Sequence, residues 1–213
     1  MKFGGVSIAI VAVAGATALG LPPVANANPL SQRSGAPFMR VYGVAQPPYG
    51  HVQFCERAPI ECRTGAVEDQ RFNASAERLN ELDRVNRQVN REIAPATDLE
   101  IYGQTEYWTI PTTRGDCEDY ALLKRKRLIA RGWPASALLM TVVRDEKGEG
   151  HAVLTVRTQQ GDFVLDNKVN EVKVWFKTGY HYVMRQSYLN PRIWMTLDPI
   201  DGTTEMNLAG VGQ

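Results

Sequence analysis

The stretch Thr112–Leu128, TTRGDCEDYALLKRKRL, predicts the start of a helix and places one cysteine at that start. Cys117 stands among three carboxylates, Asp116, Glu118 and Asp119. An aspartate can cap a helix, and acids in a first turn interact favourably with the helix dipole. The same acids disfavour a thiolate, which is the reactive form of cysteine. The sequence therefore raises the question of what these carboxylates do beside Cys117.

Two helices are predicted from apolar residues at helical spacing. The first runs from a Ser75 cap to about Ile93, ahead of Pro95, with an apolar stripe formed by Leu79, Leu82, Val85, Val89 and Ile93. The second starts at Asp116 or Cys117 and ends near Ala130, with a stripe formed by Ala121, Leu122, Leu128 and Ile129. The run Lys124-Arg125-Lys126-Arg127 spreads around the helix, so we interpret most of it as solvated surface.

Short runs rich in β-branched and aromatic residues follow the second helix. They are ALLMTVVR, HAVLTVR, DFVLDN, EVKVWF, HYVMRQS and IWMTL, separated by turns such as DEKGEG and QQGD. Helices followed by an antiparallel meander predict an α+β domain, with N-terminal helices packed on an antiparallel sheet. We expect this domain over residues 67–200, an irregular segment over 28–66 and a tail over 201–213.

The first residues have the features of a secretory signal peptide. Lys2 precedes an apolar run, and Ala25-Asn26-Ala27 is a cleavage pattern, so residues 1–27 are predicted to be removed after Ala27. An uncleaved anchor is the rival interpretation, but the run is short for a membrane span. Basic and acidic residues nearly balance, at 24 and 23, which gives no support for nucleic acid as a partner.

Export makes the cysteines informative, because thiols tend to pair in oxidising compartments. Cys55 and Cys62 flank a short loop that a disulfide could close. Cys117 is then left over, as a buried inert thiol, an intermolecular disulfide or a nucleophile. A cysteine nucleophile needs a base, usually histidine, and a group that orients the base.

His151 opens the strand HAVLTVR, and Asp166 ends the strand FVLD. A hairpin centred between Thr158 and Gln159 would place His151 opposite Asp166, and would also pair Val153 with Val164, Ala152 with Leu165, and Leu154 with Phe163. Such a register makes one apolar face and one His–Asp pair. The alternative is that both residues are ordinary polar residues at strand ends.

The motifs GDCEDYALLKRKRLIARGW, GEGHAVLTVR and FVLDN resemble those of the bacterial transglutaminase-like cysteine peptidases, which include the LapG-type periplasmic proteases. The resemblance covers roughly residues 50–200. It implies a papain- and transglutaminase-like fold in which Cys117 is the nucleophile, His151 the general base and Asp166 its orienting partner. It also implies periplasmic endopeptidase activity on a protein substrate such as a surface adhesin, and control by an inner-membrane receptor.

The three acids around Cys117 have two explanations. They could cap the helix, with Asp116 at the N-cap and Asp119 three residues later, or they could bind Ca²⁺, which takes several oxygen ligands. The residues alone leave both open. The resemblance implies calcium held by Asp116 and Glu118, with Asp119 as a weaker ligand.

Two other functions remain open from the sequence. The same acyl-enzyme resolved by an amine would make the protein a transglutaminase or amidase, and a degenerate site would make it a non-catalytic periplasmic binding domain. An oxyanion could be bound by the backbone N–H of Cys117 and by Trp108 or Gln104, although we expect Trp108 to belong to the core. A metalloprotease is disfavoured because HExxH is absent from the sequence.

Overall fold

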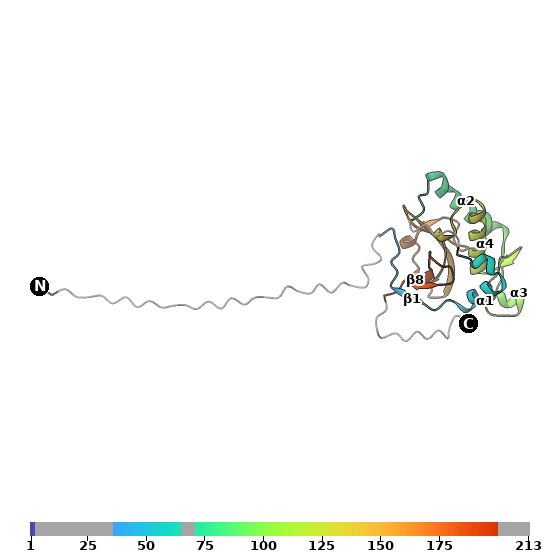
Figure 1. Ribbon diagram of the computed structural model, residues 1–213, viewed down its shortest axis with the longest axis horizontal. Coiled ribbons are helices and arrows are strands. Elements are labelled where there is room, and N and C mark those ends of the chain that lie inside the picture. Colours follow the sequence, from blue (N-terminus) through green and yellow to red (C-terminus); the bar gives the residue numbers. More distant parts are fainter. Residues whose placement is uncertain (3–35, 65–70, 200–213) are drawn as a thin grey trace. The chain divides into compact units, whose positions relative to one another are not determined.

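The protein folds around a seven-stranded antiparallel sheet with the strand order β1-β9-β8-β4-β5-β6-β7 (Figure 1). The computed structural model describes residues 1–2, 36–64 and 71–199. The strands of the sheet are β1 Gly43–Ala45, β4 Leu138–Arg144, β5 Gly150–Thr158, β6 Gly161–Leu165, β7 Lys173–Val174, β8 His181–Gln186 and β9 Trp194–Thr196.

Within the described residues, four α-helices and a small parallel pair accompany the sheet. The helices are α1 Tyr49–Arg57, α2 Ala76–Glu92, α3 Asp98–Tyr102 and α4 Cys117–Ala130. The parallel pair joins β2 Ala94–Pro95 to β3 Arg114–Gly115. Three 3₁₀ turns complete the described elements: η2 Pro59–Cys62, η3 Ala135–Ala137 and η4 Trp175–Lys177.

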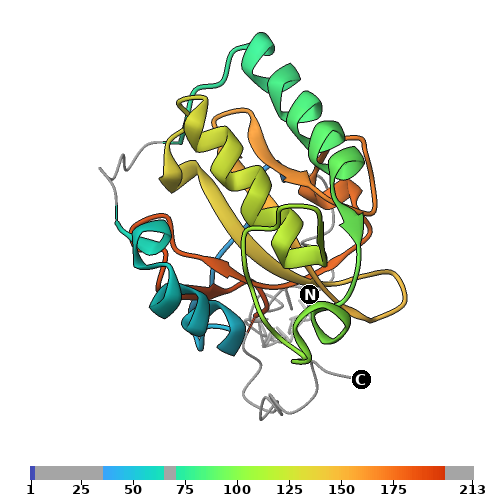
Figure 2. The same cartoon turned by 90° about the vertical axis from the view of Figure 1, so that its right-hand side faces the viewer.

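The main core lies between the sheet and α4, which runs across the strands with α2 beside it (Figure 2). From α4 the core takes Leu122 and Leu128, and from β5 it takes Leu154 and Val156. A smaller apolar cluster on the opposite face includes Val143, Val153 and Val164. The alternation of these residues along the strands is what directs them to opposite faces. The predicted α+β class is confirmed.

Helix α2 forms where its apolar spacing predicted it. Ser75 is the N-cap, and its hydroxyl accepts a hydrogen bond from the backbone N–H of Arg78. Leu82, Val85 and Val89 are buried against the core. The capping hydroxyl and the apolar stripe together account for both the start and the orientation of this helix.

Helix α4 corrects the prediction for the basic run. Lys124 and Arg125 are buried, with 0% and 5% of their surface exposed, whereas Lys126 is exposed. The Arg125 guanidinium donates to the carbonyl oxygens of Leu138 and Glu61. The helix is covered on most sides, by the sheet, α2 and the N-terminal segment, so it has too little open surface for four solvated cations.

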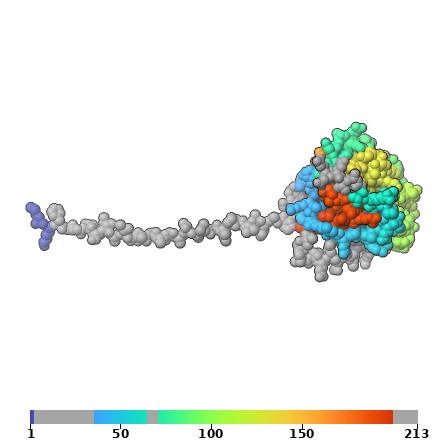
Figure 3. Space-filling view, in the orientation of Figure 1, coloured from blue at the N-terminus to red at the C-terminus, as the bar shows by residue number. Residues whose placement is uncertain are grey.

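The N-terminal segment also differs from the prediction of irregular structure over 28–66. Strand β1 pairs with β9, and α1 packs into the core through Phe54 and Cys55. A disulfide joins Cys55 to Cys62. In Figure 3 the blue and cyan N-terminal segments surround the orange-red end of the sheet. The short β1 and α1 lack sustained periodicity, and their burial comes from tertiary contacts.

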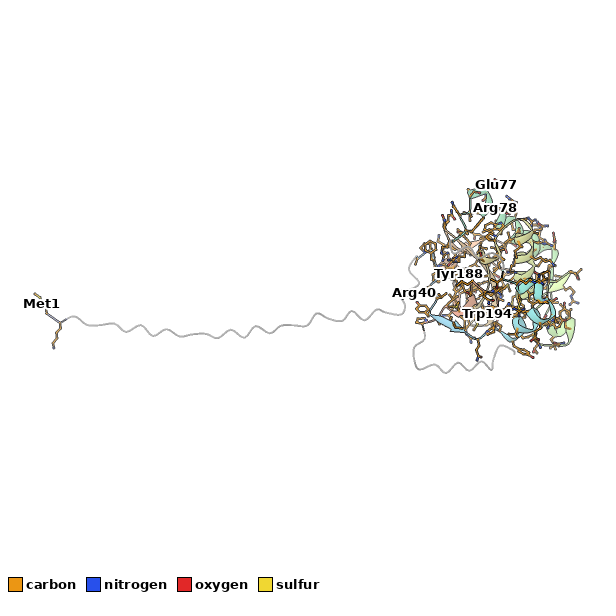
Figure 4. The ribbon with its side chains drawn as sticks, in the orientation of Figure 1. Met1, Arg40, Glu77, Arg78, Tyr188 and Trp194 are labelled. Atoms are coloured by element: carbon orange, nitrogen blue, oxygen red, sulfur yellow. A yellow bond between two sulfur atoms is a disulfide. The ribbon has the colours of Figure 1, made fainter. Side chains whose placement is uncertain are left out.

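His51 holds α1 against the last strand. Its two ring nitrogens lie 3.2 Å from Trp194 Nε1 and 2.9 Å from Gln186 Nε2. Trp194, labelled in Figure 4, is fully buried. Burial, followed by the charges of Arg125 and Arg192, lowers the pKa of His51 to about 4, so this histidine is neutral and structural.

The β5–β6 hairpin has a register two residues away from the predicted one. The observed pairs include Leu154 with Leu165 and Thr155 with Val164. The turn closes between Thr158 and Gly161, whose φ of 141° an L side chain rarely adopts, so the turn centre lies one residue later than expected. A shift of two residues keeps every side chain on its predicted face.

The predicted signal peptide over 1–27 and the tail over 201–213 lie outside the described residues, apart from Met1 and Lys2. Among the residues that are described, no helix combines the length and apolar character needed to cross a bilayer.

Candidate active site

Cys117 is the first residue of α4 and a free cysteine. The first turn of a helix presents unpaired backbone N–H groups and a partial positive charge, which favour a thiolate. Helix α4 lies against β5, where the backbone N–H of Ala152 is close enough to lower the pKa of the thiol. Ala152 follows His151 in the chain, so the fold brings the cysteine to the strand end that carries the predicted base.

His151 and Asp166 form the predicted pair. Nε2 of His151 lies 2.9 Å from Oδ1 of Asp166, and 3% of His151 and 4% of Asp166 is exposed. Asp166 follows β6 directly, and its side chain reaches His151 diagonally although the two are not direct ladder partners. An ionised carboxylate can only accept, so the shared proton belongs to Nε2 of His151.

The other ring nitrogen of His151 is available as a base. Nδ1 is buried and has no hydrogen-bond partner in the described part of the chain. Cys117 Sγ instead donates to Oε2 of Glu118 at 3.2 Å, and no hydrogen bond joins it to His151 among the residues described. With Nε2 protonated, the free lone pair is on Nδ1, as proton abstraction from a thiol requires.

Asp166 is held by donors from several elements. Burial alone would raise its pKa, but hydrogen bonds from His151, Tyr180 and the backbone N–H of Lys168 keep the pKa below its ordinary value. Helix α2 contributes as well, because the Asn90 side chain donates to the backbone carbonyl of Asp166 at 2.9 Å. The carboxylate therefore stays ionised and fixed in place.

The side chains around Cys117 oppose a thiolate. Burial raises the pKa of the thiol well above its ordinary value, and the charge of Glu118 raises it further. Burial and the neighbouring Asp116 also raise the pKa of Glu118 itself. Of the three acids beside Cys117 in the sequence, Glu118 and Asp116 are therefore the two that disfavour its thiolate.

A third acid joins two of the predicted ligands. Oxygen atoms of Asp98, Asp116 and Glu118 lie within 4.8 Å of one another. The parallel β2–β3 pair brings them together, because it places the segment before α3 beside the segment before α4. The backbone N–H of Asp98 donates to Oδ2 of Asp116 at 3.2 Å. Asp98 was missed because it lies 18 residues from Asp116 in sequence, without a motif around it.

The donor set of this cluster fits a hard cation. Oδ1 of Asp98 and Oδ1 of Asp116 are buried without hydrogen-bond partners among the described residues. Asp116 makes no side-chain cap with α4, so capping does not explain it. Clustered carboxylate oxygens are the ligands that Ca²⁺ prefers. The structure thus favours the cation explanation for Asp116 and Glu118 over the capping explanation.

Asp119, the third predicted ligand, is not in this cluster. Its Oδ1 accepts the backbone N–H of Thr109 at 2.8 Å, which ties the preceding loop to α4. Burial, with the charges of Asp116 and Asp98, raises the pKa of Asp119 to about 8. A Cβ at residue 115 would lie 2.6 Å from Oδ2 of Asp119, so a larger residue there would require Asp119 to shift.

The two side chains considered for an oxyanion site have other surroundings. Trp108 is buried in the core, as expected, and its indole N–H donates to Oε2 of Glu106 at 2.9 Å. Gln104 is exposed. The backbone N–H of Cys117 remains the candidate donor at the start of α4.

Comparisons with known proteins identify the family of this chain. The profile of the family described as bacterial transglutaminase-like cysteine proteinase BTLCP matches residues 41–201. No curated protein matches the chain. Among solved structures, calcium-bound LapG of Legionella pneumophila is similar at 25% identity and a TM-score of 0.47, over 55% of this chain and 68% of that one. The EGTA-treated form of LapG gives the same identity and TM-score over 66% of its length. Because the family profile spans more than half of its residues, this chain belongs to the bacterial transglutaminase-like cysteine proteinases.

Proposed function

We propose that the protein is a calcium-dependent periplasmic cysteine endopeptidase with the catalytic residues Cys117, His151 and Asp166. The observation that carries this proposal is the buried His151–Asp166 pair, which leaves Nδ1 of His151 without a partner at the strand end beside α4. Cys117, at the first residue of that helix, is free to react because Cys55 and Cys62 are disulfide-bonded. These are the parts that a cysteine nucleophile needs.

In this mechanism Nδ1 of His151 takes the proton from the Cys117 thiol, and the sulfur attacks the carbonyl carbon of the substrate. His151 then gives the proton to the leaving amine, and water hydrolyses the resulting thioester with the same histidine as its base. Asp166 keeps the proton on Nε2 and stabilises the imidazolium. Backbone N–H groups at the start of α4 face the developing negative charge on the carbonyl oxygen.

Asp98, Asp116 and Glu118 would hold the calcium ion. When bound, Ca²⁺ supplies positive charge that compensates the carboxylates which otherwise raise the pKa of Cys117. Glu118 is the link between the two sites, since its Oε2 accepts a hydrogen bond from the thiol of Cys117, with 3.2 Å between Sγ and Oε2. If Glu118 bound the ion instead, the thiol of Cys117 would lose this acceptor, and His151 would be the base that takes its proton.

The family and the leader-like N-terminus support a proposal for the partners. A cysteine proteinase of this family acts on a protein, and we propose a surface adhesin with an exposed periplasmic end as the substrate. We also propose control by an inner-membrane receptor that sequesters the protease. The signal-peptide features of residues 1–27 support export to the periplasm.

The alkylation rate of Cys117 tests this proposal without requiring a known substrate. The protein lacking residues 1–27 is treated with iodoacetamide over a range of pH, in Ca²⁺ and in EGTA, with the disulfide kept oxidised. Mass spectrometry counts the alkylated sites, and Cys117 is the free cysteine. We expect fast alkylation well below the ordinary thiol pKa in Ca²⁺, and slow alkylation in EGTA.

Matched variants separate the metal from the nucleophile. Asp98→Asn should remove the calcium effect, whereas Asp83→Asn, at a more exposed acid paired with Arg87 on α2, should leave it unchanged. Fast alkylation that ignores EGTA would keep the nucleophile and reject the calcium site. Slow alkylation in both conditions would reject the enzyme. The mass of products separates hydrolysis, which adds water, from amine transfer, which loses ammonia.

A further inference from the structure

Tyr180 contacts both the acid and the base of the pair just described. Its hydroxyl donates to Oδ2 of Asp166 at 2.6 Å. Its ring meets the His151 imidazole edge-on, with centroids 5.7 Å apart and an angle of 82° between the planes. We infer that Tyr180 is a positioning residue that locks the Asp166 carboxylate and, through it, the Nε2-protonated tautomer of His151. This inference rests on the proposed function.

The hydrogen bonds of Asp166 show why one hydroxyl matters. Oδ1 accepts two donors, Nε2 of His151 and the backbone N–H of Lys168, each at 2.9 Å. Oδ2 accepts from Tyr180 and from no other group among the described residues. Without the Tyr180 hydroxyl, Oδ1 of Asp166 keeps its hydrogen bonds and Oδ2 has none. Rotation of the carboxylate about its terminal torsion then breaks fewer hydrogen bonds and costs less free energy.

The hydroxyl of Tyr180 is a permanent donor. Burial, together with its hydrogen bond to Asp166, raises the pKa of Tyr180 far above its ordinary value. It is therefore protonated wherever a cysteine peptidase works, and it cannot compete with His151 for the proton. A phenol that always donates is suited to hold a carboxylate ionised.

The fold presents Tyr180 from a short turn between η4 and β8. Gly179 has a φ of 81°, which reverses the chain just before Tyr180. The Thr178 hydroxyl donates to the carbonyl of Trp175 at 2.8 Å and accepts the backbone N–H of Tyr180 at 3.3 Å. The turn is braced by its own hydrogen bonds, which hold the backbone that carries Tyr180.

Tyr182 offers a matched control. Its hydroxyl lies in the same turn region but bonds to the carbonyl of Trp175 at 3.2 Å and to the Thr178 hydroxyl at 3.0 Å. Tyr182→Phe thus removes a buried phenolic hydroxyl, leaves the Thr178 bonds to Trp175 and Tyr180 in place, and removes no hydrogen bond to Asp166. Tyr180→Phe removes only the oxygen that holds the carboxylate and keeps the ring beside His151.

The experiment has two readouts on the exported form of the full chain, in Ca²⁺. The first is the rate of Cys117 alkylation by iodoacetamide at one neutral pH. The second is the ¹⁵N spectrum of labelled histidine, in which His151→Gln assigns the His151 signals and the two nitrogen shifts report the tautomer. Thermal unfolding confirms that both variants are folded.

We expect Tyr180→Phe to slow alkylation by about tenfold, the effect of losing one hydrogen bond to a charged group, and to mix the two His151 tautomers. Tyr182→Phe should keep the wild-type tautomer and rate. Equal behaviour of Tyr180→Phe and wild type would overturn the inference, as would equal effects of the two variants. If wild-type Cys117 reacts slowly in both Ca²⁺ and EGTA, the proposed function itself fails, which is a distinguishable result.

Discussion

Lys124 is a buried cation whose removal should stabilise the protein in a pH-dependent way. Its Nζ lies in the interior without a hydrogen-bond partner among the described residues, 5.7 Å from the centre of the Tyr120 ring. Burial lowers its pKa from the ordinary 10.5 to about 7, although the charge of Asp166 opposes this shift. The perturbation is Lys124→Met, which keeps the length of the side chain and removes the charge.

The sign follows from which state binds the proton. Below about pH 7 Lys124 is protonated in both folded and unfolded chains, and the folded state bears the full cost of the buried charge. Each pKa unit corresponds to about 1.4 kcal/mol, so this cost reaches up to about 5 kcal/mol. Between pH 7 and 10.5 the unfolded chain binds a proton that the folded chain lacks, so wild-type stability gains from rising pH.

The assay is urea unfolding of wild type and Lys124→Met at several pH values, with the difference in free energy of unfolding as the result. We expect the variant's advantage to be largest near pH 6 and to shrink by a few kcal/mol towards pH 10. Lys126→Met is the control, because Lys126 is exposed on the same helix and should give a difference of less than about 0.5 kcal/mol. A Lys124→Met difference that does not change with pH would refute the reasoning.

Three further predictions concern the disulfide, the acid cluster and the turn before α4. Replacing Cys55 and Cys62 together by Ala should lower the free energy of unfolding by about 2–3 kcal/mol, since the disulfide closes a loop with a sequence separation of 7; chemical denaturation measures it. Asp98→Asn should abolish the rise in melting temperature that Ca²⁺ causes in wild type; calorimetry with and without EGTA measures it, and a preserved rise contradicts the site. For wild type, calcium at a thousandfold above its dissociation constant should raise the free energy of unfolding by about 4 kcal/mol. Gly115→Ala should lower the free energy of unfolding, because the new methyl group would lie 2.6 Å from Oδ2 of Asp119. It should also weaken calcium binding, because Gly115 directly precedes Asp116. Chemical denaturation measures the stability, and an unchanged value would show that the Asp119 carboxylate can move aside.

Local signals in the sequence predicted the parts of the fold that depend on local chemistry. The Ser75 cap and the 3.6-residue spacing after it specify α2, and the buried runs of β4 and β5 specify the centre of the sheet. The hairpin faces were right although the register was wrong, because a two-residue slip preserves the alternation. His151 and Asp166 meet for the same reason, since they remain on one face.

Other features depend on contacts between distant segments, and no local pattern marks them. Asp98 reaches the acid cluster through the two-residue β2–β3 pair, and Tyr180 reaches Asp166 through a braced turn 14 residues later. The basic run predicts an ordinary exposed cation at Lys124, and only the packing of α4 shows that this residue is buried. Contacts between segments that are distant in sequence determine where all three residues lie.

The attachment of β1 and α1 to the sheet bears on how this protein can be shortened. A fragment that begins at residue 67 would expose the backbone of β9 as an open edge and uncover Trp194, whose surroundings come from α1. Unpaired edges beside apolar surface recruit other chains. Such a fragment would keep all of the proposed catalytic residues and still be expected to precipitate, so the N-terminal segment acts as the cover of this sheet edge.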